Sequence, residues 1–361
     1  MTKAMYVHVP FCDHICAYCD FTRCGYYQPL AEQWLCAIKK ELQEKSLEPC
    51  ISMYIGGGTP SALSESQLKT LLEALAPYTE HVSEYTMEAN AESLSTAKIA
   101  LLVKYGVNRI SMGAQSFQPH HLRRMERSAD YSMIKQCIEE LRSHHIKNIS
   151  LDLMYGLPDQ TMSEWEEDLH KAMALPITHL SLYALTIEEN SRFGKANIKP
   201  CDSDVEADFY ERAMKLLNAN GFQQYEISNF ARDHRVSRHN LAYWHYEDFY
   251  GIGCGASGKE NHVRYDNTRN LHTYIQNGPS PEQIRLTPEE EMFEMMMMGL
   301  RLQEGVADTT FHKRFDCSYH DVFEDAIQKH IALGNLQEYD CRLSATEQGM
   351  MLLHEILVDF L

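Results

Sequence analysis

Short runs rich in β-branched and aromatic residues alternate six times with longer segments of helical periodicity, and this alternation restricts the fold more than any other feature. A strand–helix repeat of this kind predicts a parallel sheet with helices covering one or both of its faces. The predicted strands cover 5–10, 51–58, 84–90, 109–115, 148–156 and 179–186, and the predicted helices cover 29–45, 65–77, 95–105, 131–145 and 162–174.

The strand spacing suits a barrel and a doubly wound sheet equally well, and the position of the unusual residues favours the barrel. Three cysteines follow the first strand, the run GGGTP (56–60) ends the second, Glu88 closes the third, Gln115 closes the fourth and Asp152 lies in the fifth. Polar residues at the carboxyl ends of successive parallel strands converge on one mouth, where barrel enzymes carry their sites. We therefore predict an α/β fold built on a partial (β/α) barrel of about six parallel strands.

The pattern changes after residue 187. A long helix over 203–220 is followed by a strand over 223–231, a loop-rich stretch, and a segment over 277–290 that has the composition of a linker. We predict three regions on this basis. They are a partial barrel over residues 1–230, a loop-rich segment over 231–286, and a small helical, winged-helix-like domain over 287–361 that ends in a β-wing.

Charge and hydropathy limit the classes of partner. The formal net charge of −18 argues against a nucleic-acid partner, because phosphate binding requires clustered Lys and Arg. The first residues do not have a signal-peptide pattern, and the Met-rich run MFEMMMMGL (292–300) is too short to span a bilayer. We expect a cytoplasmic protein with no intrinsic membrane anchor.

Three of the eleven cysteines form the one tight cluster: Cys12, Cys16 and Cys19, spaced C-x3-C-x2-C. Structural zinc usually has four ligands, often in two separated pairs, and no second C-x2-C pair occurs, although His14 or Cys24 could act as a fourth ligand. A 4Fe-4S cluster takes four ligands, so three cysteines leave one iron open to a small molecule. The glycines of GGGTP would let backbone amides approach such a ligand closely.

The spacing C-x3-C-x2-C, with Tyr18 before the last cysteine, resembles the radical S-adenosylmethionine superfamily. The resemblance implies that Cys12, Cys16 and Cys19 bind a 4Fe-4S cluster and that the open iron binds the amino and carboxylate groups of S-adenosylmethionine.

A longer series of motifs is similar to oxygen-independent coproporphyrinogen III oxidase and its relatives over roughly residues 4–270. The matching segments are YVHVPFCDHICAYCDF, GGGTP, TMEANAE, RISMGAQSF, RSAD and DLMYGLP. The resemblance implies Tyr6, Gly58 and Glu88 near the first S-adenosylmethionine. At a second nucleotide-binding position it implies Tyr18, Thr59, Pro60, Gln115, Arg127 and Asp152, with Ala184 as a weaker candidate.

Within that family the chain resembles the HemW-type heme chaperones more than the oxidase. The oxidase has a further Cys two residues after the third and a long extension before its cysteines, whereas Asp20 and Phe21 follow Cys19 here and eleven residues precede Cys12. The segment HNLAYW (239–244) matches one typical of HemW proteins, and the match implies that His239 is associated with heme.

Some features depart from the pattern or leave alternatives open. Ser257 stands where relatives favour a His, and the rival heme-associated histidines are His8, His245, His262 and His272. We expect a chaperone that binds a 4Fe-4S cluster, S-adenosylmethionine and heme and delivers heme to apo-proteins, with an electron donor as a further partner. The alternatives are an oxidase that decarboxylates coproporphyrinogen III to protoporphyrinogen IX and a radical enzyme with another substrate. A homodimer stays open.

Overall fold

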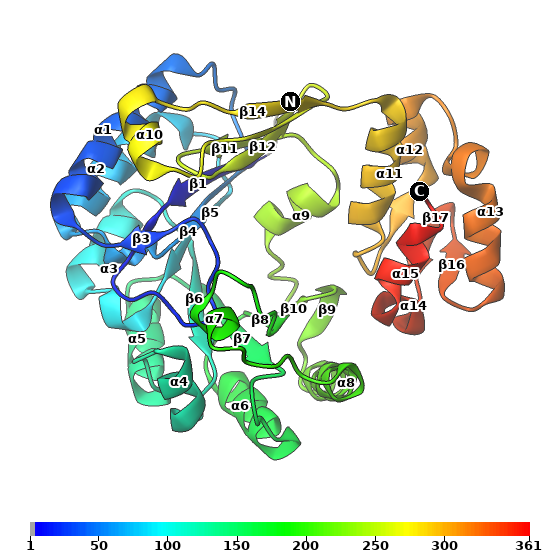
Figure 1. Cartoon of the computed structure of the whole chain (residues 1–361), viewed down its shortest axis with the longest axis horizontal. Helices are drawn as coiled ribbons and strands as arrows, with labels where there is room; N and C mark the ends of the chain where they lie inside the picture. Colours follow the sequence, from blue (N-terminus) through cyan, green and yellow to red (C-terminus); the bar gives the residue numbers. More distant parts are fainter. Residues whose placement is uncertain (1–3) are drawn as a thin grey trace.

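The computed structural model describes residues 4–361. Six strands form a curved sheet, and the helices that follow them lie around its outside (Figure 1). A smaller helical unit lies to one side of this barrel. The six strands are β1 (Ala4–Val9), β4 (Ser52–Gly57), β5 (Glu84–Ala89), β6 (Arg109–Gln115), β7 (Asn148–Tyr155) and β8 (His179–Ala184). Their helices include α1 (Gln28–Glu44), α2 (Glu65–Leu75), α3 (Thr96–Lys104), α4 (Pro119–Met125), α5 (Tyr131–Ser143) and α6 (Met162–Ala174). The predicted α/β fold and its strand–helix order are confirmed.

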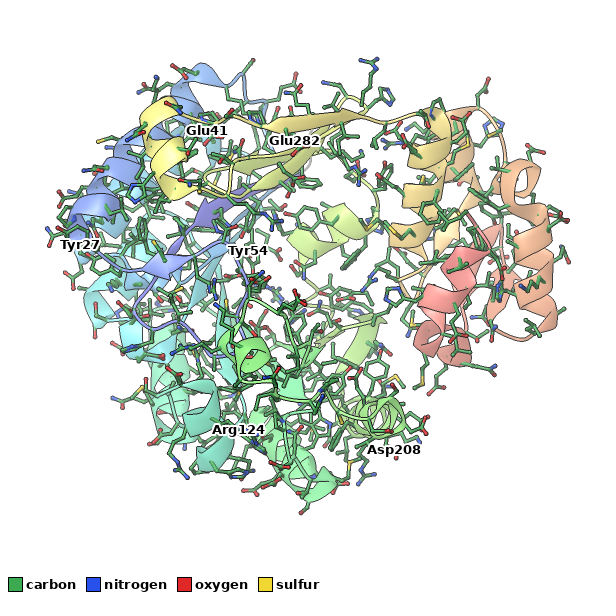
Figure 2. The ribbon with its side chains drawn as sticks, viewed as in Figure 1. Tyr27, Glu41, Tyr54, Arg124, Asp208 and Glu282 are labelled. Carbon is green, nitrogen blue, oxygen red and sulfur yellow. The ribbon has the colours of Figure 1, made fainter. Side chains whose placement is uncertain are left out.

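All six strands pair in parallel, in the order β1-β4-β5-β6-β7-β8, so their carboxyl ends lie along one edge of the sheet. The register of β1 and β4 pairs Tyr6 with Tyr54, so these two side chains lie beside each other. Side chains two residues apart along a strand share one face of the sheet. Figure 2 shows Tyr54 within the ring of helices, whereas Tyr27 and Arg124 lie nearer its outside.

The helices form because their sequences combine N-terminal caps with one apolar face. Ser64 and Gln67 form a capping box at the start of α2, and the same device joins Thr161 and Glu164 at the start of α6. The buried face of α2 consists mainly of leucines, and Trp165 of α6 is fully buried in the barrel core. These faces cover the outside of the sheet and close its core.

The segment predicted to be loop-rich extends the same sheet. The strand β11 (Phe249–Ile252) pairs in parallel with β1, and β12 (Ser257–Glu260), β13 (Val263–Asp266) and β14 (Glu282–Arg285) continue from it in antiparallel pairs. The expectation of a linker over 277–290 is therefore wrong, because β14 is a strand at the edge of the sheet. Two helices complete the segment, α9 (Arg238–Trp244) and α10 (Leu271–Asn277).

The other edge of the sheet also differs from the prediction. Instead of one strand over 223–231, two short strands form a hairpin, β9 (Gln223–Glu226) and β10 (Asn229–Ala231), and β10 pairs antiparallel with β8. The turn forms because the Glu226 carboxylate accepts the backbone N–H of Ser228 at 2.9 Å. The hairpin follows α7 (Arg192–Lys195) and the long helix α8 (Ser203–Ala219), which the sequence predicted.

The C-terminal unit has its own apolar core, which includes Tyr246 and Phe311. Its hairpin, β16 (Leu336–Tyr339) and β17 (Arg342–Ala345), is joined by β15 (Val306–Ala307). The expected β-wing is present but does not end the chain, because two helices follow it. The helices are α11 (Pro288–Gly299), α12 (Asp308–Phe315), α13 (Tyr319–Ala332), α14 (Glu347–Met351) and α15 (Leu353–Val358).

The division of the chain at residues 230 and 286 stays a prediction. Residues 1–3, which the first predicted region includes, lie outside the described part of the chain. Among residues 4–361, no helix has both the length and the apolar composition that crossing a membrane requires.

Candidate functional site

The three clustered cysteines lie in a loop that is fixed at both ends. The short strands β2 (Phe11–Cys12) and β3 (Cys24–Gly25) pair in parallel directly after β1. The N–H of Cys24 donates to the Pro10 carbonyl at 2.7 Å, and the N–H of Tyr26 donates to the Cys12 carbonyl at 2.8 Å. The two ends of the loop between Cys12 and Cys24 are therefore held side by side by backbone hydrogen bonds, directly after β1.

Cys12 is buried, whereas Cys16 and Cys19 are half-buried, and all three are free thiols. Burial raises the pKa of Cys12 to about 12, and the charges of the other two cysteines add to this shift, so both lie within electrostatic reach of Cys12. Three sulfur donors in one fixed loop fit a 4Fe-4S cluster that has one iron without a protein ligand. They could hold such a cluster as thiolates, because a metal centre deprotonates its cysteine ligands.

Gly58 fixes the loop against the end of β4. A Cβ atom at this position would lie 2.7 Å from the Phe11 carbonyl oxygen and 3.0 Å from the Cys12 sulfur. Its N–H also donates to the Val9 carbonyl at 2.7 Å. The backbone of GGGTP therefore approaches the cysteine loop more closely than any residue with a side chain would allow.

Glu88 lies at the carboxyl end of β5, next to the glycine run. Its carboxylate accepts the Tyr54 hydroxyl at 2.8 Å and the Gly57 N–H at 3.0 Å. Burial raises its pKa to about 7, and the nearby Asp152 carboxylate contributes to this shift. Burial likewise raises the pKa of Asp152 to about 6, which the hydroxyl of Ser111, 3.4 Å away, partly opposes. Two half-buried carboxyl groups, on β5 and β7, therefore lie near each other.

Tyr6 belongs to a chain of hydrogen bonds that reaches the cysteine loop. The His8 Nε2 atom is 2.7 Å from the Thr22 carbonyl oxygen, so Nε2 carries the proton and donates it. The Nδ1 atom must then accept the Tyr6 hydroxyl at 3.0 Å. Burial lowers the pKa of His8, in agreement with a neutral ring.

Residues predicted for a second nucleotide position gather around Arg127. Its guanidinium donates to the Gly113 carbonyl at 2.6 Å and to Asn90 Oδ1 at 3.1 Å, and Nη1 lies 3.8 Å from the Cys16 sulfur. Asn90 in turn donates to Thr59 Oγ1 at 3.4 Å.

Other predicted members of this set lie close by. The charge on Arg127 lowers the pKa of Tyr18, although burial raises it more, and it lowers the pKa of Asp152 in the same way. Gln115 ends β6 with a φ of 67°, and its amide nitrogen lies 2.8 Å from the place where a Cβ on Gly113 would be. Pro60, the last residue of GGGTP, begins a short 3-10 helix, and Ala184 ends β8. The structure therefore brings Tyr18, Thr59, Gln115 and Asp152 near Arg127, whereas no contact within the described part of the chain links Ala184 to them, and the roles of all these residues stay predictions.

His239 lies on α9, where its ring is stacked on Tyr54 at a centroid distance of 5.0 Å. Its Nδ1 bonds to the Ser52 hydroxyl at 3.1 Å, and its Nε2 bonds to the Tyr243 hydroxyl at 2.8 Å. Burial lowers the pKa of His239 to about 3, so the ring is neutral. Neither nitrogen is free, and His239 fits an axial heme ligand only if Nε2 first leaves the hydroxyl of Tyr243.

The rival histidines have other partners. His245 is paired with Glu304 at 2.6 Å and His262 with Glu291 at 2.5 Å, whereas His272 is exposed. Of the five candidates, His8 and His239 line the cavity described next.

A cavity of about 760 Å³ connects the mouth of the barrel with the C-terminal unit. Tyr6, Tyr54, Glu88 and His239 line it from the barrel side, and Met297 and Met298 of α11 line it from the C-terminal unit. The volume lies in the range of about 300–1,000 Å³ that is typical of ligand pockets. Its aromatic and thioether walls suit a flat apolar molecule with polar edges.

Sequence reasoning missed Tyr54, which contacts both Glu88 and His239, and the two methionines. Tyr54 could have been found from strand periodicity, because it precedes Gly56 by two residues and therefore faces the same side of β4. No sequence signal identified Met297 and Met298 among the methionines of the same run.

The comparisons with known proteins agree with this geometry. Residues 6–172 match the radical SAM superfamily, and residues 286–352 match the HemN C-terminal domain. Coproporphyrinogen III oxidase (HemN) from Escherichia coli covers 99% of this chain and 90% of its own with a TM-score of 0.86 at 20% identity, which shows that the fold is shared.

Three relatives named heme chaperone HemW are more similar in sequence. That of Lactococcus lactis is 35% identical over 99% of this chain and 97% of its own length, and that of Bacillus subtilis is 34% identical over 99% of both. That of Escherichia coli is 33% identical over 99% of this chain and 98% of its own length. With this identity along almost its whole length, the chain belongs to the HemW family within the radical SAM superfamily.

Proposed function

We propose that the protein is a heme chaperone that binds a 4Fe-4S cluster, S-adenosylmethionine and heme, and that delivers heme to acceptor apo-proteins. The observation that carries this proposal is the cavity between the barrel mouth and α11, where Tyr6 and Glu88, both predicted to contact S-adenosylmethionine, share the lining with His239 and two methionines. The names of the full-length relatives support it. The proposed partners are heme, the acceptor apo-proteins and an electron donor for the cluster.

The proposed cluster ligands are Cys12, Cys16 and Cys19. When bound, the cluster supplies an electron and one iron with a free coordination position. Gly58 keeps the strand end against the cysteine loop, and Arg127 places a positive charge 3.8 Å from the Cys16 sulfur. A positive charge at this distance would attract a negatively charged cluster, because opposite charges attract strongly where water is excluded.

For S-adenosylmethionine we propose two groups of contacts, as the family resemblance implies. Tyr6, Gly58 and Glu88 serve the first position, and Glu88 offers a half-buried carboxylate to a positively charged ligand. Tyr18, Thr59, Pro60, Gln115, Arg127 and Asp152 serve the second, where the hydrogen bonds of Arg127 hold three chain segments in a fixed arrangement.

For heme we propose the cavity lined by Tyr54, His239, Met297 and Met298. Imidazole and thioether groups are both axial ligands of heme iron in proteins. Because the Tyr243 hydroxyl occupies Nε2 of His239, the ring must exchange this hydrogen bond for a bond to iron. Replacing Tyr243 by Phe removes that competitor and should strengthen heme binding.

The test is a heme titration of the full chain, followed by the Soret band, for wild type and three variants. His239→Ala should bind heme more weakly, Tyr243→Phe should bind it more tightly, and His272→Ala, which removes an exposed histidine, should behave as wild type. Heme affinity that is the same in His239→Ala and wild type would contradict the assignment of His239.

The enzymatic alternative is oxidation of coproporphyrinogen III, which the shared fold with the HemN protein keeps under test. An anaerobic preparation with an assembled cluster, S-adenosylmethionine, a low-potential reductant and coproporphyrinogen III should give no protoporphyrinogen IX. Multiple turnovers in this assay would overturn the chaperone proposal. Size-exclusion chromatography of the same preparation would show whether the chain forms a homodimer.

A further inference from the structure

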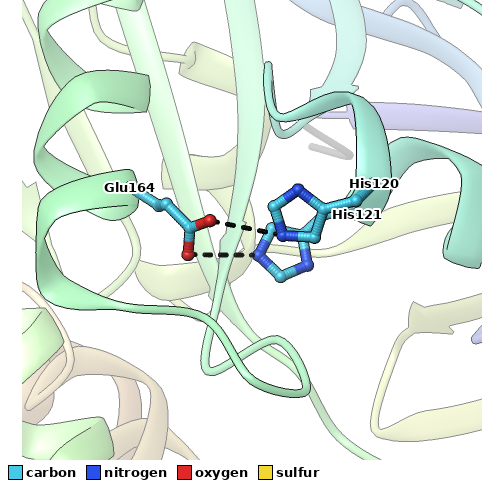
Figure 3. A group of neighbouring side chains, drawn as sticks. All are labelled: His120, His121 and Glu164. Atoms are coloured by element: carbon cyan, nitrogen blue, oxygen red, sulfur yellow. Dashed lines mark ion pairs between the residues drawn. The ribbon is translucent and has the colours of Figure 1, made fainter.

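Two helices on the outside of the barrel bring two histidines and a glutamate together (Figure 3). His120 and His121 are on α4, and Glu164 is in the first turn of α6. One ligand atom from each residue lies within 4.8 Å of the other two, and this is the one such group of three among residues 4–361. None of the three lines the cavity proposed for heme.

His121 has a buried ring nitrogen without a hydrogen-bond partner. The side chain is 1% exposed, and its Nε2 atom makes no hydrogen bond. The nearest carboxylate oxygen, Oε2 of Glu164, is 3.7 Å away, which is too far for a hydrogen bond. Buried polar atoms are nearly always satisfied, by protein groups, water or an ion, so this nitrogen can accept a further partner between the side chains.

The distances within the group suit a shared metal ion. His120 Nε2 is 3.3 Å from Glu164 Oε1, and the two imidazole rings have centroids 4.0 Å apart. A tetrahedral ion with bonds of about 2.0–2.1 Å separates two of its ligand atoms by about 3.3–3.4 Å. Small movements of the side chains would therefore be enough to close the site around an ion.

Glu164 is already held in place from behind. Its Oε2 atom accepts the Thr161 N–H at 2.8 Å and the Thr161 hydroxyl at 2.9 Å, as part of the capping box that begins α6. Hydrogen bonds of this kind orient a ligating carboxylate before the ion arrives. His120 is half exposed, so solvent can reach the group and fill an open coordination position.

From these observations we propose that His120, His121 and Glu164 form a binding site for a divalent transition-metal ion of the zinc type, which ties α4 to α6. Two imidazoles and one carboxylate suit zinc and its neighbours, whereas magnesium and calcium prefer oxygen ligands alone. The site does not depend on the proposed heme function, because it shares no residue with the cysteine loop or the cavity.

The test compares Zn²⁺ binding by the full chain and matched variants, with the cluster assembled in all of them. Glu164→Gln removes the anionic ligand but keeps the capping box, which accepts Gln as well as Glu. His121→Asn removes the buried ligand. The control is His170→Ala, which removes an exposed histidine from α6, the helix that carries Glu164. Bound zinc is counted by elemental analysis, and affinity is measured by competition with a chelator.

Wild type and His170→Ala should bind one Zn²⁺ more than Glu164→Gln and His121→Asn. The cysteines are the same in every variant, so zinc bound to them cancels in the difference. Loss of a residue that only hydrogen-bonds to a metal ligand weakens binding by roughly 10- to 100-fold. Loss of a ligand itself should weaken Zn²⁺ binding by more than this. Zn²⁺ should also raise the Tm of wild type and leave that of Glu164→Gln unchanged.

Equal zinc content and equal affinity in wild type and Glu164→Gln would overturn the proposal. If either variant fails to fold, His120→Ala replaces it, because His120 is half exposed and its loss should not disturb the core. Zinc retained by a folded His120→Ala with unchanged affinity would equally refute the site.

Discussion

Asp168 of α6 is a fully buried carboxyl group that holds the loop between β6 and α4. It accepts the Ser116 hydroxyl at 2.6 Å, the Phe117 N–H at 3.0 Å and the Gln118 side-chain amide at 3.1 Å. Asp168→Ala leaves these three donors without an acceptor. Because each unsatisfied buried donor costs about 1–3 kcal/mol, the free energy of unfolding should fall by about 3 kcal/mol or more.

The same carboxyl group predicts a dependence on pH. Burial raises the pKa of Asp168 from 3.8 to about 6, against the effect of its hydrogen bonds. Between these two pKa values the folded chain keeps a proton that the unfolded chain has released, so stability falls as the pH rises. A difference of about two pKa units corresponds to roughly 3 kcal/mol of the free energy of unfolding at low pH, and this contribution is lost once the pH rises above 6.

Asp168→Asn does not titrate and therefore isolates this effect. Relative to wild type, the Asn variant should gain roughly 3 kcal/mol of stability between pH 4 and pH 7. The assay is urea unfolding followed by far-UV circular dichroism at several pH values. The buried carboxyl group would be refuted by a stability difference between wild type and Asp168→Asn that stays constant over this range, or by an Asp168→Ala variant as stable as wild type.

Three further perturbations test the site and its support. Gly58→Ala places a Cβ 2.7 Å from a backbone carbonyl oxygen of β2, so the amount of iron and sulfide bound per chain after cluster assembly should fall. The control is Gly25→Ala, where a Cβ has no atom within 4 Å and the bound iron and sulfide should not change. Arg109→Met leaves the buried Glu84 carboxylate without its ion pair, 3.5 Å away, and should cost about 3–5 kcal/mol in urea unfolding. The raised pKa of Glu88, about 7, predicts that the affinity of wild type for S-adenosylmethionine increases from pH 6 to pH 8 as the carboxylate forms. Glu88→Gln should bind it weakly at both pH values, and equal affinity in the two proteins at pH 8 would exclude Glu88 from the contact.

The barrel was predictable because its signals are local. Each of the six parallel strands is a short apolar run bounded by turns, and the helices α2, α3, α5 and α6 each begin with a side-chain cap. The polar residues at the strand ends were predicted to meet because parallel strands share one carboxyl edge. Glu88 and Asp152 do lie close enough for the charge of one to shift the pKa of the other.

The strand β11 was missed because its sequence, FYGI, is interrupted by glycine. Gly251 is needed for close packing, since a Cβ there would lie 2.0 Å from the Ser257 carbonyl oxygen. A requirement set by a neighbouring strand has no local signature. The edge strand β14 was hidden for a different reason: it is exposed on both faces, shows no alternation and follows Pro279 and Pro281.

The contacts of His239 could not be predicted either. Its partners Ser52 and Tyr54 are almost 190 residues earlier in the chain, and only the fold brings α9 over β4. The sequence indicated an imidazole beside Tyr243 and Trp244 but gave no sign that both ring nitrogens are occupied.

The pairing of β1 with both β4 and β11 has a consequence for the order in which the protein is assembled. The ribosome makes β1 first, but its second neighbour begins at Phe249, so one edge of β1 stays open until more than two thirds of the chain has been synthesised. Pairings between such distant segments form late, because the long intervening chain must first be ordered. Gly253 and Gly255, which follow β11, pack on His8 and Thr22 beside the cysteine loop. The loop therefore reaches its final surroundings only after translation has passed residue 255, and the proposed cluster would enter its native site only after that point.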